Sequence, residues 1–192
     1  MTPLPDGPLF VIIGAGEQRY DGWISTHIEQ LDLRERASFE RFFGGRRAAR
    51  FLCEHVWEHL TEAEGRAAAR LCFDFLEPGG FLRVAVPDAN FPDAAYQDMV
   101  KPGGPGPADH PAADHKLVYD HTLLSDVFAS AGFEVDLLEY CDVRGRFHYN
   151  DWDYASAPVY RSFRSDHRNR NHTLGFVSLI LDAVKPSRQL SS

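Results

Sequence analysis

The stretch LFVIIGAG, residues 9–16, decides the fold of this chain. Residues 9–13 form a short apolar run with β-branched side chains, which is typical of a parallel strand buried on both faces. Gly14 and Gly16 follow directly, where a tight turn needs residues that accept positive φ. The stretch lacks the third glycine and the helix start that a dinucleotide pyrophosphate needs. It therefore predicts the first strand of an α/β sheet, with bare backbone on which a phosphate-free ligand can lie.

The next segments continue the sheet. Residues 23–28 (WISTHI) alternate and carry β-branched side chains, so they predict a second strand. Only about ten residues separate the two strands, which is near the lower limit for a parallel crossover. We therefore expect the helix after the first strand to be short or missing. A helical turn is expected over residues 38–43 and a third strand over residues 50–53.

The clearest helix begins at Thr61. The sequence Thr61-Glu62-Ala63-Glu64 has the capping-box pattern, and apolar residues then recur at three- and four-residue steps up to Phe75. The sequence Pro78-Gly79-Gly80 should stop this helix, and residues 81–86 (FLRVAV) predict the next strand.

The second half combines long irregular segments with further regular elements. Residues 91–115 are rich in Pro, Gly and Asp and predict a long loop, of the kind that often serves as a lid. A helix is expected over 117–131 and strands over 133–140 and 174–184, with a polar and aromatic insertion at 142–172. The alternation predicts a single α/β domain over residues 1–192, with a mostly parallel sheet and an antiparallel strand near the C-terminal end.

Composition limits the classes of partner. The 192 residues carry a formal net charge of −8 and a pI near 5.5, which oppose a general affinity for nucleic acid or anionic membranes. The three cysteines show no paired spacing, and no apolar stretch reaches membrane-spanning length. We expect a cytoplasmic protein with reduced thiols and a small-molecule or protein partner.

Several motifs follow one another in an order that resembles a known family. They are GAG at 14–16, GWI at 22–24, LDL at 31–33, EHVWEHL at 54–60, LEPGG at 76–80, RVAVPD at 83–88 and AGF at 131–133. This order resembles a short branch of the class I S-adenosylmethionine-dependent methyltransferases, and the likeness runs from about residue 10 to residue 185.

The resemblance implies a Rossmann-like fold and a set of cofactor-binding residues. Gly14, Ala15 and Gly16 would lie under the methionine portion of S-adenosylmethionine. Asp32 and Leu33 would contact the adenine. Glu54 and His55 would lie by the methionine and sulfonium end.

Two positions depart from the family pattern. His27 stands where the family has the acidic residue that holds the ribose diol, and Ile12 stands where an acid often precedes the glycines. Cofactor binding could therefore be weakened, so a non-catalytic or non-methylating S-adenosylmethionine-binding protein of the same fold remains an alternative.

Methyl transfer from a sulfonium depends mainly on alignment, with a base where the acceptor must lose a proton. The candidate bases are His55, Glu58, His59 and His148, in that order. The methyl acceptor is expected to be an unidentified small molecule or another acceptor, and its reacting atom is not evident from the sequence. Either the 91–115 loop or a second subunit should close the site, so a homodimer is one expectation.

The same segment also fits an alternative class. The sequence from His55 to His59 matches the H-x-x-E-H pattern of zinc hydrolases, with two histidines as ligands and Glu58 as general base. No third ligand is evident, and the segment lies between a strand and a helix cap. Acidic and histidine residues also gather at 109–115 (Asp109, His110, Asp114 and His115), but such groups in a polar loop are usually solvated. We therefore expect no metal.

Overall fold

A computed structural model of the chain describes residues 4–170 and 173–187. Its strands are β1 (Leu9–Ile13), β2 (Trp23–Ser25), β3 (Ala48–Glu54), β4 (Leu76–Pro87), β5 (Glu134–Cys141), β6 (Phe147–Tyr149) and β7 (Ser178–Val184). Its α-helices are α1 (Arg36–Phe43), α2 (Glu62–Phe75), α3 (Ala94–Val100) and α4 (His121–Ala129). Short 3₁₀ turns are η1 (Trp57–His59), η2 (Tyr154–Ser156) and η3 (His167–Asn169).

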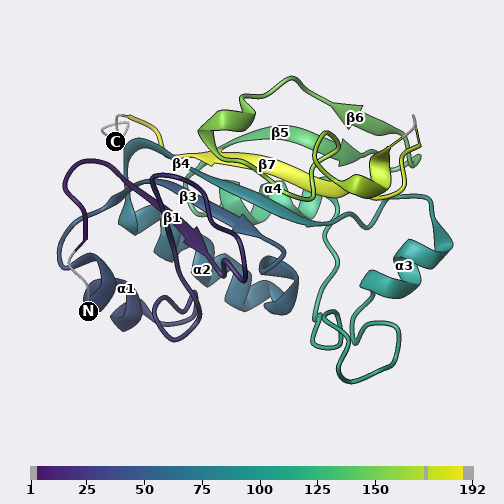
Figure 1. Cartoon of the computed structure of the whole chain (residues 1–192), viewed down its shortest axis with the longest axis horizontal. Coiled ribbons are helices and arrows are strands. Elements are labelled where there is room, and N and C mark those ends of the chain that lie inside the picture. The colour runs from purple at the N-terminus through teal and green to yellow at the C-terminus, as the bar shows by residue number, and fades with distance from the viewer. Residues whose placement is uncertain (1–3, 171–172, 188–192) are drawn as a thin grey trace.

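The strands form one mixed sheet in the order β2-β1-β3-β4-β7-β5-β6 (Figure 1). The strands β2, β1, β3 and β4 pair in parallel, whereas β7 pairs antiparallel with both β4 and β5. The strand β6 pairs antiparallel with β5 and forms a hairpin with it. The sequence did not predict β6 as a strand. The expected mostly parallel sheet with an antiparallel last strand is confirmed.

The two faces of the sheet are covered differently. Val11 and Ile13 of β1 belong to the large core under α1, α2 and α4, which lie on one face (Figure 1). Ile12 points to the opposite face, because side chains alternate along a strand. There it packs in a smaller core with Trp152 and Val159 of the insertion. Irregular chain therefore takes the place of helices on that second face.

The local signals for two connections are confirmed. No helix lies between β1 and β2 in the described chain, and the Ala15 amide instead bonds the Thr26 carbonyl at 2.9 Å. The helix α2 starts at its capping box: the Glu64 amide donates to the Thr61 hydroxyl at 3.3 Å, and the Thr61 amide donates to the Glu64 carboxylate at 2.8 Å. These bonds from Thr61 lower the pKa of Glu64 to about 2.

Other predicted segments differ from the structure. The loop predicted over 91–115 contains the helix α3, which Asp93 caps by accepting from the Tyr96 amide at 2.7 Å. The predicted helix over 117–131 begins only at His121, because Tyr119 forms a parallel bridge with Asp88 and Asp120 is the N-cap. The strand β2 stops at Ser25 and β7 starts at Ser178, so both are shorter than predicted.

Conversely, β4 starts at Leu76 and runs through the Pro-Gly-Gly turn, because Leu76 pairs with Ala48 of β3. The last two residues of the predicted 142–172 insertion lie outside the described residues. None of the helices in the described part of the chain is both long and apolar enough to cross a membrane.

Candidate functional site

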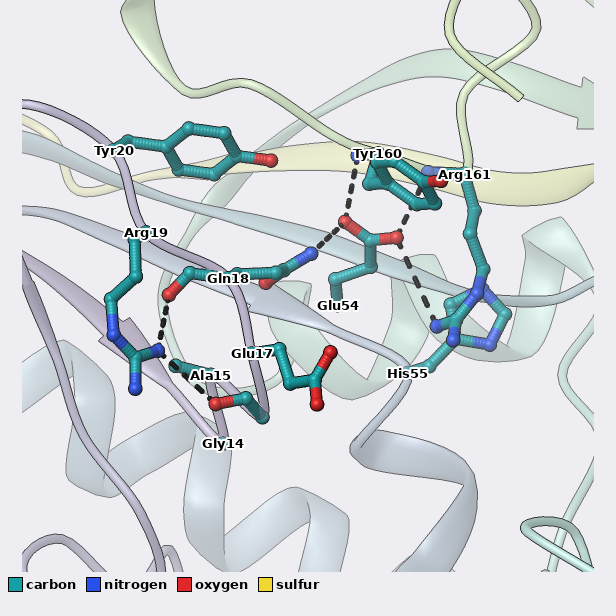
Figure 2. Close-up of a pocket in the computed structure, with 11 residues that line it drawn as sticks. Gly14, Ala15, Glu17, Gln18, Arg19, Tyr20, Glu54, His55, Tyr160 and Arg161 are labelled. Carbon is teal, nitrogen blue, oxygen red and sulfur yellow. Dashed lines mark hydrogen bonds and ion pairs between the residues drawn. The ribbon is translucent and has the colours of Figure 1, made fainter. Parts of the chain in front are cut away.

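A cavity of about 640 Å³ opens where β1 and β3 end at their carboxyl edge. Three segments far apart in the sequence form its walls: the turn after β1, the end of β3 and part of the insertion (Figure 2). The lining residues are Gly14, Ala15, Gly16, Glu17, Gln18, Arg19, Tyr20, Glu54, His55, Tyr160 and Arg161.

Both glycines of the GAG turn are required, for different reasons. Gly14 has φ 65°, and a Cβ there would meet the Val56 side chain at 2.5 Å, so its missing side chain permits close packing. Gly16 has φ 52°, and nothing lies within 4 Å of where its Cβ would be. The missing side chain at Gly16 therefore contributes open space to the cavity.

The Glu54 carboxylate joins the three walls of the cavity. It accepts from the Gln18 side chain at 2.5 Å and from the backbone amides of Tyr160 and Arg161 at 2.8 and 2.9 Å (Figure 2). The Arg161 guanidinium lies 3.9 Å from the same carboxylate. A buried carboxylate needs such partners, so Glu54 holds the insertion against the turn after β1.

Acidic, basic and aromatic side chains line the cavity. The Arg19 side chain bonds the carbonyls of Gly16 and Gln18 at 3.1 and 2.6 Å, which holds the turn after β1 in shape. Burial, and then the nearby Glu54 charge, raise the pKa of Tyr20 above its usual value. Tyr20 therefore presents a neutral ring and hydroxyl at physiological pH.

His55 occupies a strained position at the end of β3. Its φ is 56°, unusual for a residue with a side chain, and its amide is held by the Ala85 carbonyl at 2.8 Å. The ring Nε2 lies 3.0 Å from the Ser178 hydroxyl, and Nδ1 lies 3.0 Å from a carboxylate oxygen of Glu58. His55 therefore lines the cavity with both of its ring nitrogens beside a defined neighbour.

The structure brings Gly14, Ala15, Gly16, Glu54 and His55 together, but it places three other cofactor-binding candidates outside the lining residues. His27 is exposed beyond the end of β2. Asp32 makes a bidentate ion pair with Arg34, which lowers its pKa, and Leu33 is buried in the core.

The other candidate bases also lie outside this lining. Glu58 and His59 are in η1, where Glu58 lies against Nδ1 of His55 and His59 contacts Asp114. His148 is in β6, where it bonds the Asp142 carboxylate at 2.9 Å and stacks on Tyr140. The bond from His148 lowers the pKa of Asp142 to about 2, so this pair stabilises the hairpin.

Sequence reasoning missed several lining residues. Gln18, Arg19 and Tyr20 follow the glycines directly, and the absence of a helix after β1 was the signal that this turn would face the ligand. Tyr160 and Arg161 come from the polar and aromatic insertion predicted at 142–172, but no local pattern marked these two positions as lining residues.

The fold is also found in solved methyltransferase structures. An O-methyltransferase family protein from Burkholderia thailandensis matches 95% of this chain and 52% of its own, at 12% identity and TM-score 0.54. A SAM-dependent methyltransferase from Archaeoglobus fulgidus matches 93% of this chain and 87% of its own, at 13% identity and TM-score 0.52. The chain has the class I methyltransferase fold.

A third structure of this fold is human N-acetylserotonin methyltransferase in complex with SAM, which matches 93% of this chain and 41% of its own at 9% identity and TM-score 0.50. The chain spans about half the length of the Burkholderia protein, at 52%. Neither protein-family models nor curated proteins match the sequence.

Proposed function

We propose that the chain binds S-adenosylmethionine in the cavity beside Gly16 and transfers its methyl group to a small-molecule acceptor. One observation carries the proposal: in a class I methyltransferase fold, a glycine-lined cavity opens at the carboxyl ends of β1 and β3. Ligands of open α/β sheets bind at this edge.

The residues present fit such a cofactor. The volume of about 640 Å³ lies in the range usual for small-molecule and cofactor sites. Arg19 and Arg161 can bind the carboxylate of the amino-acid portion, and Glu17 can bind its ammonium group. Tyr20 and Tyr160 offer aromatic faces for the adenine or the cationic sulfonium.

When bound, S-adenosylmethionine supplies an electrophilic methyl group on a good leaving group. The chain's own task is then to align the acceptor and to receive its proton. Among the four candidate bases, His55 is the one that lines the cavity. We assign it to hold that proton at Nε2, which otherwise faces the Ser178 hydroxyl.

Calorimetric titration with S-adenosylmethionine and S-adenosylhomocysteine tests this proposal. The wild-type chain should bind at one site, and Gly16→Val should weaken binding at least about a hundredfold because the new side chain fills the cavity. Gly44→Val is the matched control, since Gly44 has φ 55° and open space around its Cβ position but caps α1, away from the cavity. It carries the same backbone strain.

Equal binding by wild type and Gly16→Val would place the cofactor elsewhere. No heat with either ligand at millimolar concentration would remove the proposal altogether.

A further inference from the structure

A cluster outside the cavity brings His115 close to Glu58 and His59, two adjacent residues that lie far earlier in the sequence. Glu58 and His59 lie in η1, and His115 lies at the end of the segment after α3. The Glu58 carbonyl accepts from the amides of Lys116 and Leu117 at 2.8 and 3.3 Å, which fixes the two segments side by side. One potential ligand atom from each of the three side chains lies within 4.8 Å of the others.

Glu58 is the first reason to assign a cation here. Its side chain is fully buried, and neither carboxylate oxygen makes a hydrogen bond to the described residues. The contact from His55 Nδ1, at 3.0 Å, lacks the alignment of a hydrogen bond. A buried carboxylate without hydrogen bonds carries a large desolvation cost, which a bound cation would offset.

The two histidines are the second, independent reason. His115 Nδ1 lies 2.9 Å from the Val100 carbonyl, which can only accept, so Nδ1 carries the proton and Nε2 keeps its lone pair. His59 Nδ1 lies 2.7 Å from the Asp114 carboxylate, with the same consequence for its Nε2. Metal-binding histidines characteristically use their other nitrogen in this way, toward a carbonyl or a carboxylate.

We propose that Glu58, His59 and His115 bind a divalent transition metal such as Zn²⁺. Two imidazoles and one carboxylate are ligands that zinc accepts in tetrahedral sites, with a fourth position left for water or another ligand. Bonds of about 2.0–2.1 Å require the ligand atoms to draw together by roughly 1 Å, which side-chain rotation at the partly exposed His59 allows.

This site differs from both expectations drawn from sequence. The H-x-x-E-H reading pairs His55 with His59 and makes Glu58 a base, but the structure groups Glu58 and His59 with His115 as ligands. The proposal also replaces the expectation that the chain holds no metal.

Titration of the full chain with ZnCl₂, after chelator treatment and without a histidine tag, tests the site. Wild type should bind one Zn²⁺ per chain, and binding should raise its melting temperature. Glu58→Gln and His115→Ala should each weaken binding by at least about tenfold. Replacing a residue that only orients a metal ligand already has an effect of about this size. His110→Ala is the matched control, because this histidine lies in the same segment but outside the cluster.

Circular dichroism checks that each variant folds. If His115→Ala does not fold, Co²⁺ added to the wild type decides, because nitrogen and oxygen ligands in a site of low coordination number give intense visible absorption. Absence of zinc binding, unchanged affinity in folded His115→Ala, or a Co²⁺ spectrum equal to that of the aqueous ion would each overturn the proposal. A polar pocket filled by water would give the first of these results.

Discussion

At the scale of single residues, the buried carboxylate of Glu139 joins the insertion to the sheet. Glu139 of β5 is 1% exposed, and it accepts from the Trp152 indole at 3.1 Å and from the Phe163 amide at 2.7 Å. Burial raises its pKa to about 7, although the two hydrogen bonds act in the opposite direction. Glu139 therefore holds the insertion against the sheet, and its burial disfavours the charged form of the carboxylate.

This raised pKa predicts a pH-dependent stability. The unfolded value is about 4.3, so between that pH and about 7 the folded state binds more protons, and the free energy of unfolding falls as pH rises. The loss between pH 5 and pH 8 should be roughly 2–3 kcal/mol, at about 1.4 kcal/mol per unit. Urea unfolding at both pH values should show this loss in wild type and a much smaller one in Glu139→Gln.

Glu134→Gln is the control, because this exposed glutamate lies on the same strand. An identical pH dependence in wild type and Glu139→Gln would show that Glu139 does not titrate in this range.

The residue scale also shows how the histidines of the H-x-x-E-H pattern lie. An H-x-x-E-H pattern places both histidines on one face only if the segment is an α-helix. Here His55 has positive φ and residues 57–59 form a 3₁₀ turn, so His55 faces Ser178 and His59 faces Asp114. The strand before this segment and the helix cap after it indicated a turn, but spacing in sequence could not reveal the approach of His115.

At the scale of elements, the sequence predicted those helices and strands whose caps and apolar patterns lie within their own residues. The helix α2 was predicted because its cap and apolar stripe lie within its own residues. The extension of β4 across Gly79 and Gly80 depends on Lys185, whose amide and carbonyl bond these two glycines at 2.8 and 2.9 Å. No local pattern contains that pairing.

The insertion is the element on which the cavity depends. In Glu54→Ala the amides of Tyr160 and Arg161 would lose their acceptor, and hydrogen bonds to charged groups contribute about 1.5–3 kcal/mol each. Hydrogen exchange at these two amides should therefore accelerate by roughly ten- to a hundredfold, while amides of β3 and β4 keep their protection.

Asp151→Ala is the matched control, since Asp151 pairs with Arg164 on the exposed surface of the same insertion. Unchanged exchange in Glu54→Ala, or equal acceleration in both variants, would show that Glu54 does not hold the insertion.

At the scale of the whole molecule, sequence order predicted the fold and part of the lining of the candidate cavity. The mostly parallel sheet and the position of Gly14, Gly16, Glu54 and His55 follow from strands whose carboxyl ends meet at one edge. The other wall comes from Tyr160 and Arg161, which reach Glu54 across more than a hundred residues of sequence. The irregular cover of the second sheet face was not predictable, because Trp152 and Val159 of the insertion share a core with Ile12, which is far away in sequence.

The central claim is that this cavity binds S-adenosylmethionine. The most direct measurement is a map of backbone amide chemical shifts in the labelled chain as S-adenosylhomocysteine is added. We expect the largest changes at residues 14–20, at Glu54 and His55, and at Tyr160 and Arg161, with saturation at one ligand per chain. Saturable changes centred elsewhere, for example on the β5–β6 hairpin, or no changes at millimolar ligand, would contradict it.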